Sequence, residues 1–544
     1  MNRNKFTLFL LIAIALLVPL SACKKKGEER GAGQSVVKEE FANTFRYRLR
    51  SEPPSLDWSL ATDNVSAEIL FNIMDGLLHY DSNLYLQPAL AESWDISRDG
   101  TEYTFHIRKG VKWSDGVPLK AQDFVYSWRR LLDPGTGAEY AYFLYDIRGA
   151  KEYNLGQTKD PSAVGISAPN DETLVVKLNH SAAYFLHIPT FWVTFPQRKD
   201  IVEKRDVQWP EPGHIVTLGP FLLKSWEHDY KIVLEANPHY YKGRVAIDRV
   251  IAYIMNEDST ALSLYENGGL DVLKYFPAQD IPRLSSRSDF VQFPFLRGYY
   301  YGFNVNKPPF NDKRVRQAFS LAIDRSEFPK ILKGNQIPAT SWIPKGMLGY
   351  DTEIGLGFDA ERAKKLLAEA GYPNGQNFPK VTMEYDTRED NKVIAEKLQE
   401  FWKKQLNVQI DISNQEWKVY LKRLQTDAPP LFRLGWGADY PDPDNFMNLF
   451  TSTSGNNQTN WKNGEYDALI AKAAAELYEA ERVKLYRRAQ VILTEEEVPI
   501  MPLFIEAQNM LVHPRVKNFK PNAMAILQIR DVRLDNRAVQ VKNE

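Results

Sequence analysis

The sequence predicts an α/β protein built of several lobes. Residues 381–412 read as strand, helix and strand, which indicates a parallel pair of strands joined by a right-handed crossover. Residues 94–107 hold an Asp-Gly turn followed by alternating apolar residues, which indicates an antiparallel hairpin. The chain has 544 residues, more than one domain usually holds, so two or three lobes with an ample core are expected.

Each remaining element has its own signal. Short apolar runs predict strands at residues 173–178, 232–235 and 250–255. Asn311 or Asp312 opens a helix whose apolar residues share one face, and Asp359 caps a second helix that ends at Gly371.

Within the last unit, the periodicity places strands at residues 381–385 and 408–412 and a helix at residues 391–405. No internal repeat is visible.

The N-terminus carries an export signal. Residues 1–22 combine a positive start, an apolar run too short to span a bilayer, and small residues before Cys23, the only cysteine. The Leu-Ser-Ala-Cys box at residues 20–23 resembles the site where bacterial lipoproteins are lipidated and cut. We therefore expect an acylated Cys23 as the membrane anchor, although a plain secretory signal with a chance cysteine is the alternative. Residues 23–40, charged and without apolar periodicity, predict a flexible tether.

Charge and motifs argue against several function classes. Removing Arg3 and Lys5 with the signal leaves 66 of the 68 basic residues against 69 acidic ones, a net charge of −3, so nucleic acid is not an expected partner. The sequence has no Gly-x-Ser-x-Gly, His-Glu-x-x-His, Walker or Gly-x-Gly-x-x-Gly motif, so no enzyme and no cofactor are predicted. The eight histidines are scattered, so no metal is expected either.

The most unusual segment is aromatic and glycine-rich. Gly435 and Gly437 flank Trp436, and Arg433 and Asp439 of opposite sign lie six residues apart. The glycines would let a ligand backbone approach, while the two charges could hold the termini of an extended peptide. Core aromatics with turn residues are the alternative interpretation.

At this point the sequence resembles the oligopeptide-binding members of the extracytoplasmic solute-binding family that serves ABC importers. The resemblance covers essentially the whole mature domain. It is carried, in order, by Ser-Leu-Asp at 55–57, Leu-Ala-Glu-Ser-Trp at 90–94, Trp-Ser-Asp-Gly at 113–116, Asp-Phe-Val-Tyr-Ser-Trp at 123–128, Lys-Pro-Pro-Phe-Asn-Asp at 307–312, Asn-Gln-Glu-Trp-Lys at 414–418 and residues 436–440.

The resemblance implies a two-lobed periplasmic-binding-protein fold of type II, in the large cluster with an extra subdomain. Lobe I would combine residues 41–66, 190–296 and 507–544. An insertion subdomain would cover residues 67–189, and lobe II residues 297–506, with two hinge strands joining lobes that close on the ligand.

The resemblance also assigns site residues. Asp439 matches the carboxylate that pairs with the peptide's α-ammonium, and Arg433 matches an arginine that can meet the carboxylate of a short peptide. Further matches around the pockets, the peptide backbone and the N-terminal segment are Trp417, Trp436, Tyr140 and Glu52. The partners expected are short peptides, the permease subunits of an ABC transporter and the membrane through the lipid, and the protein is expected to be an extracytoplasmic monomer in the periplasm or on the cell surface.

The sequence departs from the family pattern, in part at positions that contact the C-terminal carboxylate of the peptide. Arg297 and Gly437 stand where a member of the family has two bonded cysteines, and Gly302 stands where that member has a glutamate. Ser320 and Asn391 replace a lysine and a histidine that contact longer peptides' carboxylates. Recognition of longer peptides therefore loses two charged contacts.

Two other classes of function compete with peptide transport. The same fold could serve as a sensor of peptide signals, or bind murein peptides, nickel complexes or sugars. An extracytoplasmic peptide hydrolase would need a nucleophile–base pair or a metal cluster, and the sequence shows neither.

Overall fold

The computed structural model describes residues 43–535, except for the side chains of Glu389, Trp417 and Lys418. The predicted signal peptide, the tether and Cys23 lie outside the described residues. In the described part of the chain, no helix is both long and apolar enough to cross a membrane. The same residues contain no group of three or more His, Cys, Asp or Glu side chains placed to hold a metal ion.

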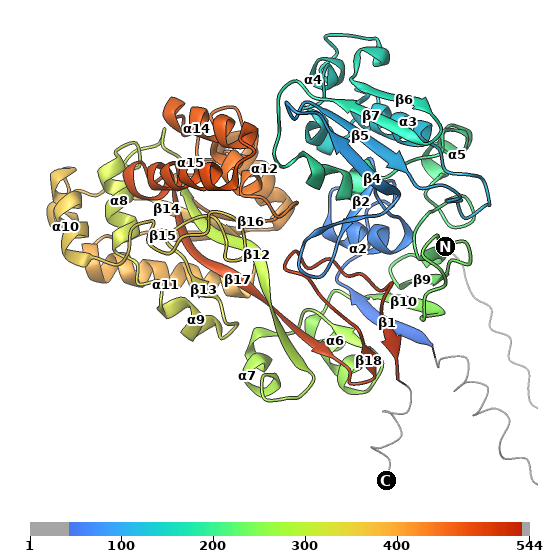
Figure 1. Ribbon diagram of the computed structural model, residues 1–544. Helices are drawn as coiled ribbons and strands as arrows, with labels where there is room; N and C mark the ends of the chain where they lie inside the picture. The colour runs from blue at the N-terminus through green and yellow to red at the C-terminus, as the bar shows by residue number, and fades with distance from the viewer. Residues whose placement is uncertain (1–42, 536–544) are drawn as a thin grey trace, which may run out of the picture. The chain divides into compact units, whose positions relative to one another are not determined.

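One large mixed sheet organises the molecule (Figure 1). Its strands follow the order β15 (Asp411–Gln415), β14 (Thr382–Asp386), β16 (Leu431–Gly437), β12 (Phe290–Phe303), β17 (Ile500–Val512), β11 (Val272–Leu273), β1 (Thr44–Leu49), β10 (Arg249–Ile254), β9 (Lys231–Ala236) and β8 (Phe221–Glu227), with β13 (Ile337–Pro338) beside β17.

The long antiparallel strands β12 and β17 connect the two halves of this sheet. At one end β12 pairs with β16, and at the other β17 pairs with β11. The register of β12 against β17 shifts between Pro294 and Gly298, so a β-bulge interrupts the ladder there.

A second sheet lies within residues 91–177. It orders β4 (Ala91–Ile96), β5 (Glu102–Ile107), β7 (Thr173–Lys177) and β6 (Ile166–Asn170), all antiparallel. Helix α3 (Ala121–Leu132) buries Phe124 and Trp128 in the same core. The smaller elements of the first half are α2 (Asn64–Ile73), β2 (Leu78–Tyr80), β3 (Leu86–Pro88), η1 (Glu139–Leu144), α4 (Ala150–Asn154), η2 (Pro161–Ala163), η3 (Phe185–Thr190), η4 (Trp192–Thr194), α5 (Lys199–Arg205) and η5 (Asp206–Gln208).

Helices cover both faces of the sheet around β16. One core packs the face that carries Tyr301 under α8 (Lys313–Leu321) and α11 (Glu389–Leu406), and another packs the face that carries Tyr300. The remaining elements are α6 (Asp258–Glu266), η6 (Ala278–Asp280), α7 (Ile281–Leu284), α9 (Glu327–Leu332), α10 (Ala360–Glu369), η7 (Pro373–Gly375), α12 (Trp417–Asp427), α13 (Asp444–Met447), η8 (Asn448–Phe450), α14 (Gly464–Ala475), α15 (Glu479–Val491), η9 (Ile492–Glu496), β18 (Val516–Lys517) and β19 (Arg533–Leu534).

The structure confirms most of the elements that the local sequence signals predicted. Asp312 and Asp359 cap α8 and α10 by accepting hydrogen bonds from the backbone of Arg314 and Arg362, each at 2.9 Å. The hairpin at residues 94–107 and the parallel β14–α11–β15 unit are also present. The chain's division at residues 67, 190, 297 and 507 stays a prediction.

One predicted boundary was wrong. The strand expected at residues 408–412 runs instead from Asp411 to Gln415. Asn407 takes a left-handed conformation with φ of 54° after α11, and Val408 and Ile410 are buried in the connecting segment. The alternation of apolar residues at this point therefore comes from the packing of a loop. A half-buried strand would show the same alternation in the sequence.

Candidate functional site

Three of the four predicted site residues of β16 lie on one face of the strand. Side chains alternate along a strand, so Arg433, Gly435 and Gly437 share a face, which we call the glycine face. A Cβ added to Gly435 would come within 2.9 Å of the carbonyl oxygen of Gly298 and 3.7 Å of Arg433 Nη2. The Arg433 side chain therefore extends along the strand toward Gly435, and the nearby Gly298 carbonyl oxygen leaves room only for glycine.

Arg433 is a buried cation whose hydrogen-bond donors are only partly used. Its residue is 2 % exposed, and Nη1 donates to Asp386 Oδ1 at 2.9 Å. The guanidinium carbon lies 4.3 Å from the centroid of the Tyr299 ring. Among the described residues, Nε and Nη2 have no hydrogen-bond partner. Two buried donors left unpaired are costly, so this group favours an incoming acceptor.

Tyr299 and Asn391 complete this end of the site. The Tyr299 hydroxyl donates to Asn391 Oδ1 at 2.9 Å, and Asn391 Nδ2 donates to Asp386 Oδ1 at 2.8 Å. Burial raises the pKa of Tyr299 to about 12, against the lowering effect of the Arg433 charge. Both uncharged side chains thus serve to fix the Arg433–Asp386 pair.

Among the described residues, the partner of the Asp439 carboxylate is an amide and not a cation. Asn445 holds it: Asn445 Oδ1 accepts from the Asp439 backbone N–H at 3.0 Å, and Asn445 Nδ2 donates to Asp439 Oδ2 at 3.4 Å. Burial raises the pKa of Asp439 to about 7. Within residues 43–535 no Lys, Arg or His forms an ion pair with it, so a cationic ligand group is what this carboxylate lacks.

Trp436 is tied to the same asparagine. Its side chain points to the face opposite the glycine face, and Nε1 donates to Asn445 Oδ1 at 2.9 Å. Asn445 therefore fixes Trp436 and Asp439 together. Sequence reasoning missed Asn445, because its only signal was its position six residues after Asp439.

Tyr140 lies near Asp439 although 299 residues separate them in the sequence. It belongs to η1 and packs edge-on against Trp192, with ring centroids 6.0 Å apart. Burial, and then the negative charge of Asp439, raises the pKa of Tyr140 far above its usual range. Tyr142, which was not predicted, feels the same charge and is 43 % exposed.

The two remaining predicted residues are placed differently. Glu52 accepts hydrogen bonds from Trp226 Nε1 at 2.8 Å and His228 Nδ1 at 2.7 Å, so its carboxylate is already engaged. Trp417 begins α12, but its side chain lies outside the described residues. Ser320 is 2 % exposed and accepts from Arg325 Nη2 at 2.9 Å, which makes it part of the core.

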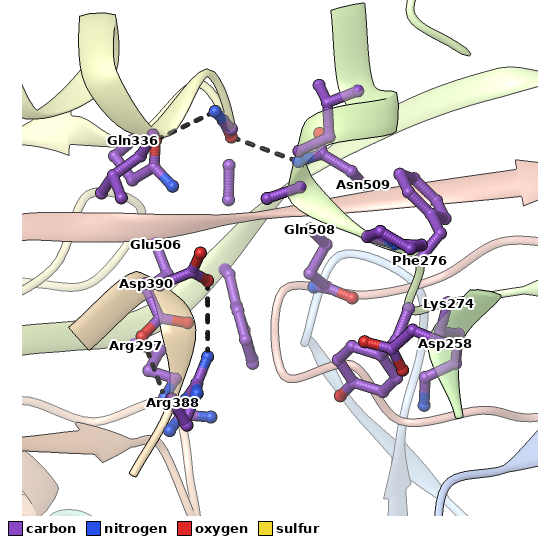
Figure 2. A pocket seen from close by; sticks show the side chains of 18 of the residues that line it. Asp258, Lys274, Phe276, Arg297, Gln336, Arg388, Asp390, Glu506, Gln508 and Asn509 are labelled. Carbon is purple, nitrogen blue, oxygen red and sulfur yellow. Dashed lines mark hydrogen bonds and ion pairs between the residues drawn. The ribbon is translucent and has the colours of Figure 1, made fainter. Parts of the chain in front are cut away.

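A cavity of about 620 Å³ opens beside Tyr299, where β12 and β17 meet α6 and the start of α11 (Figure 2). We call it the β12–β17 pocket. Figure 2 shows its charged lining in two groups, with Arg297, Glu506, Arg388 and Asp390 on one side and Asp258 and Lys274 on the other.

Fold and site together define a class of protein, the type II periplasmic binding proteins. Among the described residues, a sheet continued through two long strands places a glycine-rich segment beside a half-buried carboxylate without a counter-ion and a buried, incompletely paired guanidinium. The model for bacterial extracellular solute-binding proteins, family 5 middle, matches residues 85–458. The chain belongs to family 5 of the bacterial extracellular solute-binding proteins.

Individual relatives are similar in sequence to this protein over nearly the whole chain. The sequence is 33 % identical to the oligopeptide-binding protein OppA of Bacillus subtilis over 518 residues, 92 % of this chain and 94 % of that protein. It is 33 % identical to a probable deoxycholate-binding periplasmic protein of Escherichia coli over 525 residues, 94 % and 95 % of the two chains. The crystal structure of a periplasmic oligopeptide-binding protein from Borrelia burgdorferi matches with a TM-score of 0.80 at 33 % identity, covering 90 % of this chain and all of that one.

Proposed function

We propose that this protein binds short peptides outside the cytoplasm and delivers them to the permease of an ABC importer, without catalysing a reaction. The proposal rests on two groups that lie on one segment of the chain, the carboxylate of Asp439 and the guanidinium of Arg433. Among the described residues, Asp439 has no counter-ion and Arg433 has two unpaired buried donors, and Gly435 and Gly437 lie between them in the sequence. A ligand with an ammonium at one end and a carboxylate at the other would satisfy both.

The spacing supports short ligands. From residue 435, which the Arg433 side chain overlies, to residue 439 is four residues, or about 13 Å at roughly 3.3 Å per extended residue. An extended tripeptide spans about 10 Å by the same rise, and side-chain reach supplies the rest. Its backbone can run along Gly435 and Gly437 because neither carries a side chain.

Other residues take supporting roles in this proposal. Trp436 and Trp417 would border side-chain pockets, Tyr140 would approach the N-terminal end of the peptide, and Glu52 would contribute from the N-terminal segment. Water inside such pockets adapts its hydrogen bonds to different side chains, which suits a binder of varied sequences.

The location follows from the N-terminal signal. A lipidated Cys23 would hold a monomer at the outer side of a membrane, in the periplasm or on the cell surface, with residues 23–40 as the tether. The lobes, divided as the sequence predicts, would close on the peptide and present it to the permease.

Native mass spectrometry tests the proposal. Protein purified from its own host should carry a ladder of short peptides, and after unfolding and refolding it should take up peptides from a mixture and release them at unchanged mass. Deoxycholate is the competitor to include, because one relative is named for that ligand. Exclusive binding of deoxycholate, or shortened peptides after incubation, would contradict the proposal.

A further inference from the structure

Tyr440, the residue after Asp439, is buried among rings that belong to the first half of the chain. It is 7 % exposed. Its ring stacks on Tyr184 with centroids 5.6 Å apart and on His187 with centroids 6.4 Å apart, and Phe143 meets it edge-on at 6.1 Å. Rings in such arrangements attract one another beyond their burial. We call Tyr440 together with Phe143, Tyr184 and His187 the Tyr440 clasp.

Each side of the clasp is anchored within its own half of the chain. The Tyr440 hydroxyl donates to Asp444 Oδ2 at 2.9 Å, and the Tyr184 hydroxyl donates to Asp146 Oδ2 at 2.6 Å. Burial lowers the pKa of His187, so its imidazole is neutral at neutral pH. Uncharged rings therefore meet in the clasp, and each tyrosine takes its orientation from a carboxylate of its own half.

The backbone also joins the two halves beside the clasp. The Ala183 N–H donates to the carbonyl oxygen of Ala474 at 2.9 Å. Ala183 directly precedes Tyr184, and Ala474, from α14, packs against the same hydrophobic core as that tyrosine. The predicted insertion subdomain, residues 67–189, thus meets the predicted lobe II, residues 297–506, through main chain as well as side chains.

The clasp and the Asp439 carboxylate share two chain segments. Asp439 and Tyr440 are adjacent, so a displaced Tyr440 ring would displace the carboxylate as well. Phe143 of the clasp lies on η1 with Tyr140, whose pKa the Asp439 charge helps to raise. A carboxylate in surroundings of low dielectric constant attracts an ammonium much more strongly than one in water does. The contacts that keep water from Asp439 therefore bear directly on its affinity for a cation.

We propose that the Tyr440 clasp positions Asp439, because rings of the predicted insertion subdomain hold Tyr440 and thereby keep the carboxylate out of water and directed at the peptide's ammonium. The inference rests on the proposed function. Phe143, Tyr184 and His187 act through Tyr440, so they are positioning residues and need no contact with the ligand. By linkage, a peptide ammonium on Asp439 strengthens the clasp as much as the clasp strengthens binding.

Titration calorimetry with one tripeptide, as the free amine and as the N-acetyl form, tests this inference. In the natural protein, acetylation should weaken binding by about thirtyfold or more. In Tyr440→Leu and in Tyr184→Leu, which opens the clasp from the other side, the free peptide should lose about tenfold in affinity and the acetylated peptide little. Tyr440→Phe keeps the ring and should keep the natural discrimination. Tyr230→Leu is the control, because Tyr230 is 53 % exposed and lies outside the clasp.

The pH dependence of free-peptide binding gives a second measurement. Burial raises the pKa of Asp439 to about 7, and an opened clasp would let water in and lower that pKa toward its ordinary value. The acid decline of affinity should therefore move to lower pH in Tyr440→Leu and stay in place in Tyr440→Phe. Burial raises the pKa values of Asp146 and Asp444 too, so Asp146→Asn and Asp444→Asn check that neither carboxyl causes the decline.

A purely structural role for the clasp would weaken both forms of the peptide equally. Natural discrimination between free and acetylated peptide in Tyr440→Leu and Tyr184→Leu therefore overturns the inference, whether or not total affinity falls. An acid decline at its natural pH in both variants overturns it as well. Failure of the natural protein to bind any peptide would instead overturn the proposed function.

Discussion

Asn445 holds Asp439 by two hydrogen bonds, one to its backbone N–H at 3.0 Å and one to its carboxylate at 3.4 Å. The asparagine orients the carboxylate but brings no positive charge. Burial therefore dominates, and it raises the pKa of Asp439 to about 7. No cation of the described residues pairs with this carboxylate, which supports the proposed pairing with a ligand ammonium.

Asp439→Asn is expected to weaken tripeptide binding by about 2 to 5 kcal/mol, because the peptide ammonium would be buried without its charged partner. Calorimetry with the natural protein and the variant measures this loss. N-terminal acetylation of the peptide should cost the natural protein a similar amount and the variant little. Equal affinity of the natural protein for free and acetylated peptides would remove Asp439 from this role.

The same substitution should stabilise the protein without ligand. Burial raises the pKa of Asp439 from its ordinary value of 3.8 to about 7 in the folded protein, so folding favours its neutral form. That contribution is complete below pH about 4 and is lost as the pH rises through 7. Above pH 7, Asp439→Asn removes the cost of a buried charge, and we expect a gain of about 1 to 4 kcal/mol.

Denaturant unfolding at pH 4 and pH 8 checks this expectation. The variant's advantage should be large at pH 8 and small at pH 4. An equal difference at both pH values would show that the carboxylate carries no burial penalty.

Local signals in the sequence predicted more than long-range ones. Asp359 could be assigned to a helix cap because the cap, the apolar face and Gly371 all lie within thirteen residues. Arg433 was identified as a site residue, but its pairing with Asp386 was not, since β14 and β16 meet only through the sheet. The β12–β17 pocket could not be predicted from the sequence either, because its walls include segments more than 200 residues apart.

Gly435→Ala should destabilise the fold, whereas Gly437→Ala should not. A Cβ at residue 435 would lie 2.9 Å from the Gly298 carbonyl oxygen, and the β12–β16 ladder would have to shift at a cost of about 1 to 3 kcal/mol. A Cβ at residue 437 meets only the Arg297 side chain at 4.0 Å. Thermal unfolding of both variants measures the difference.

Gly437→Ala should weaken peptide binding although it leaves the stability of the fold unchanged. Gly437→Ala keeps a natural melting temperature but should bind tripeptide several-fold more weakly, because its methyl group occupies the glycine face where the ligand backbone would lie. Natural affinity in this stable variant would place the peptide elsewhere.

Cys23→Ser is expected to leave the protein unprocessed or in the soluble fraction, because the acyl chain is the only anchor proposed. Cell fractionation, with incorporation of labelled fatty acid into the natural protein, measures this. A variant that is still cleaved and still sediments with membranes would contradict lipidation.

Peptide affinity should fall on both sides of neutral pH, and the acid side follows from Asp439. Below pH 7 the unliganded carboxyl is protonated, because burial holds its pKa at about 7. A bound ammonium favours the ionised form, so binding must release that proton, and affinity should drop by nearly tenfold per pH unit down to the lower pKa of the complex. Above pH about 8 the peptide's own α-amino group loses its charge, and affinity should decline again. Calorimetry from pH 5 to pH 9, repeated in buffers of different ionisation enthalpy, measures both the affinity and the released proton. Asp439→Asn should keep only the alkaline decline, and a natural protein whose affinity stays flat from pH 5 to pH 7 would show that this carboxyl does not bind the ammonium.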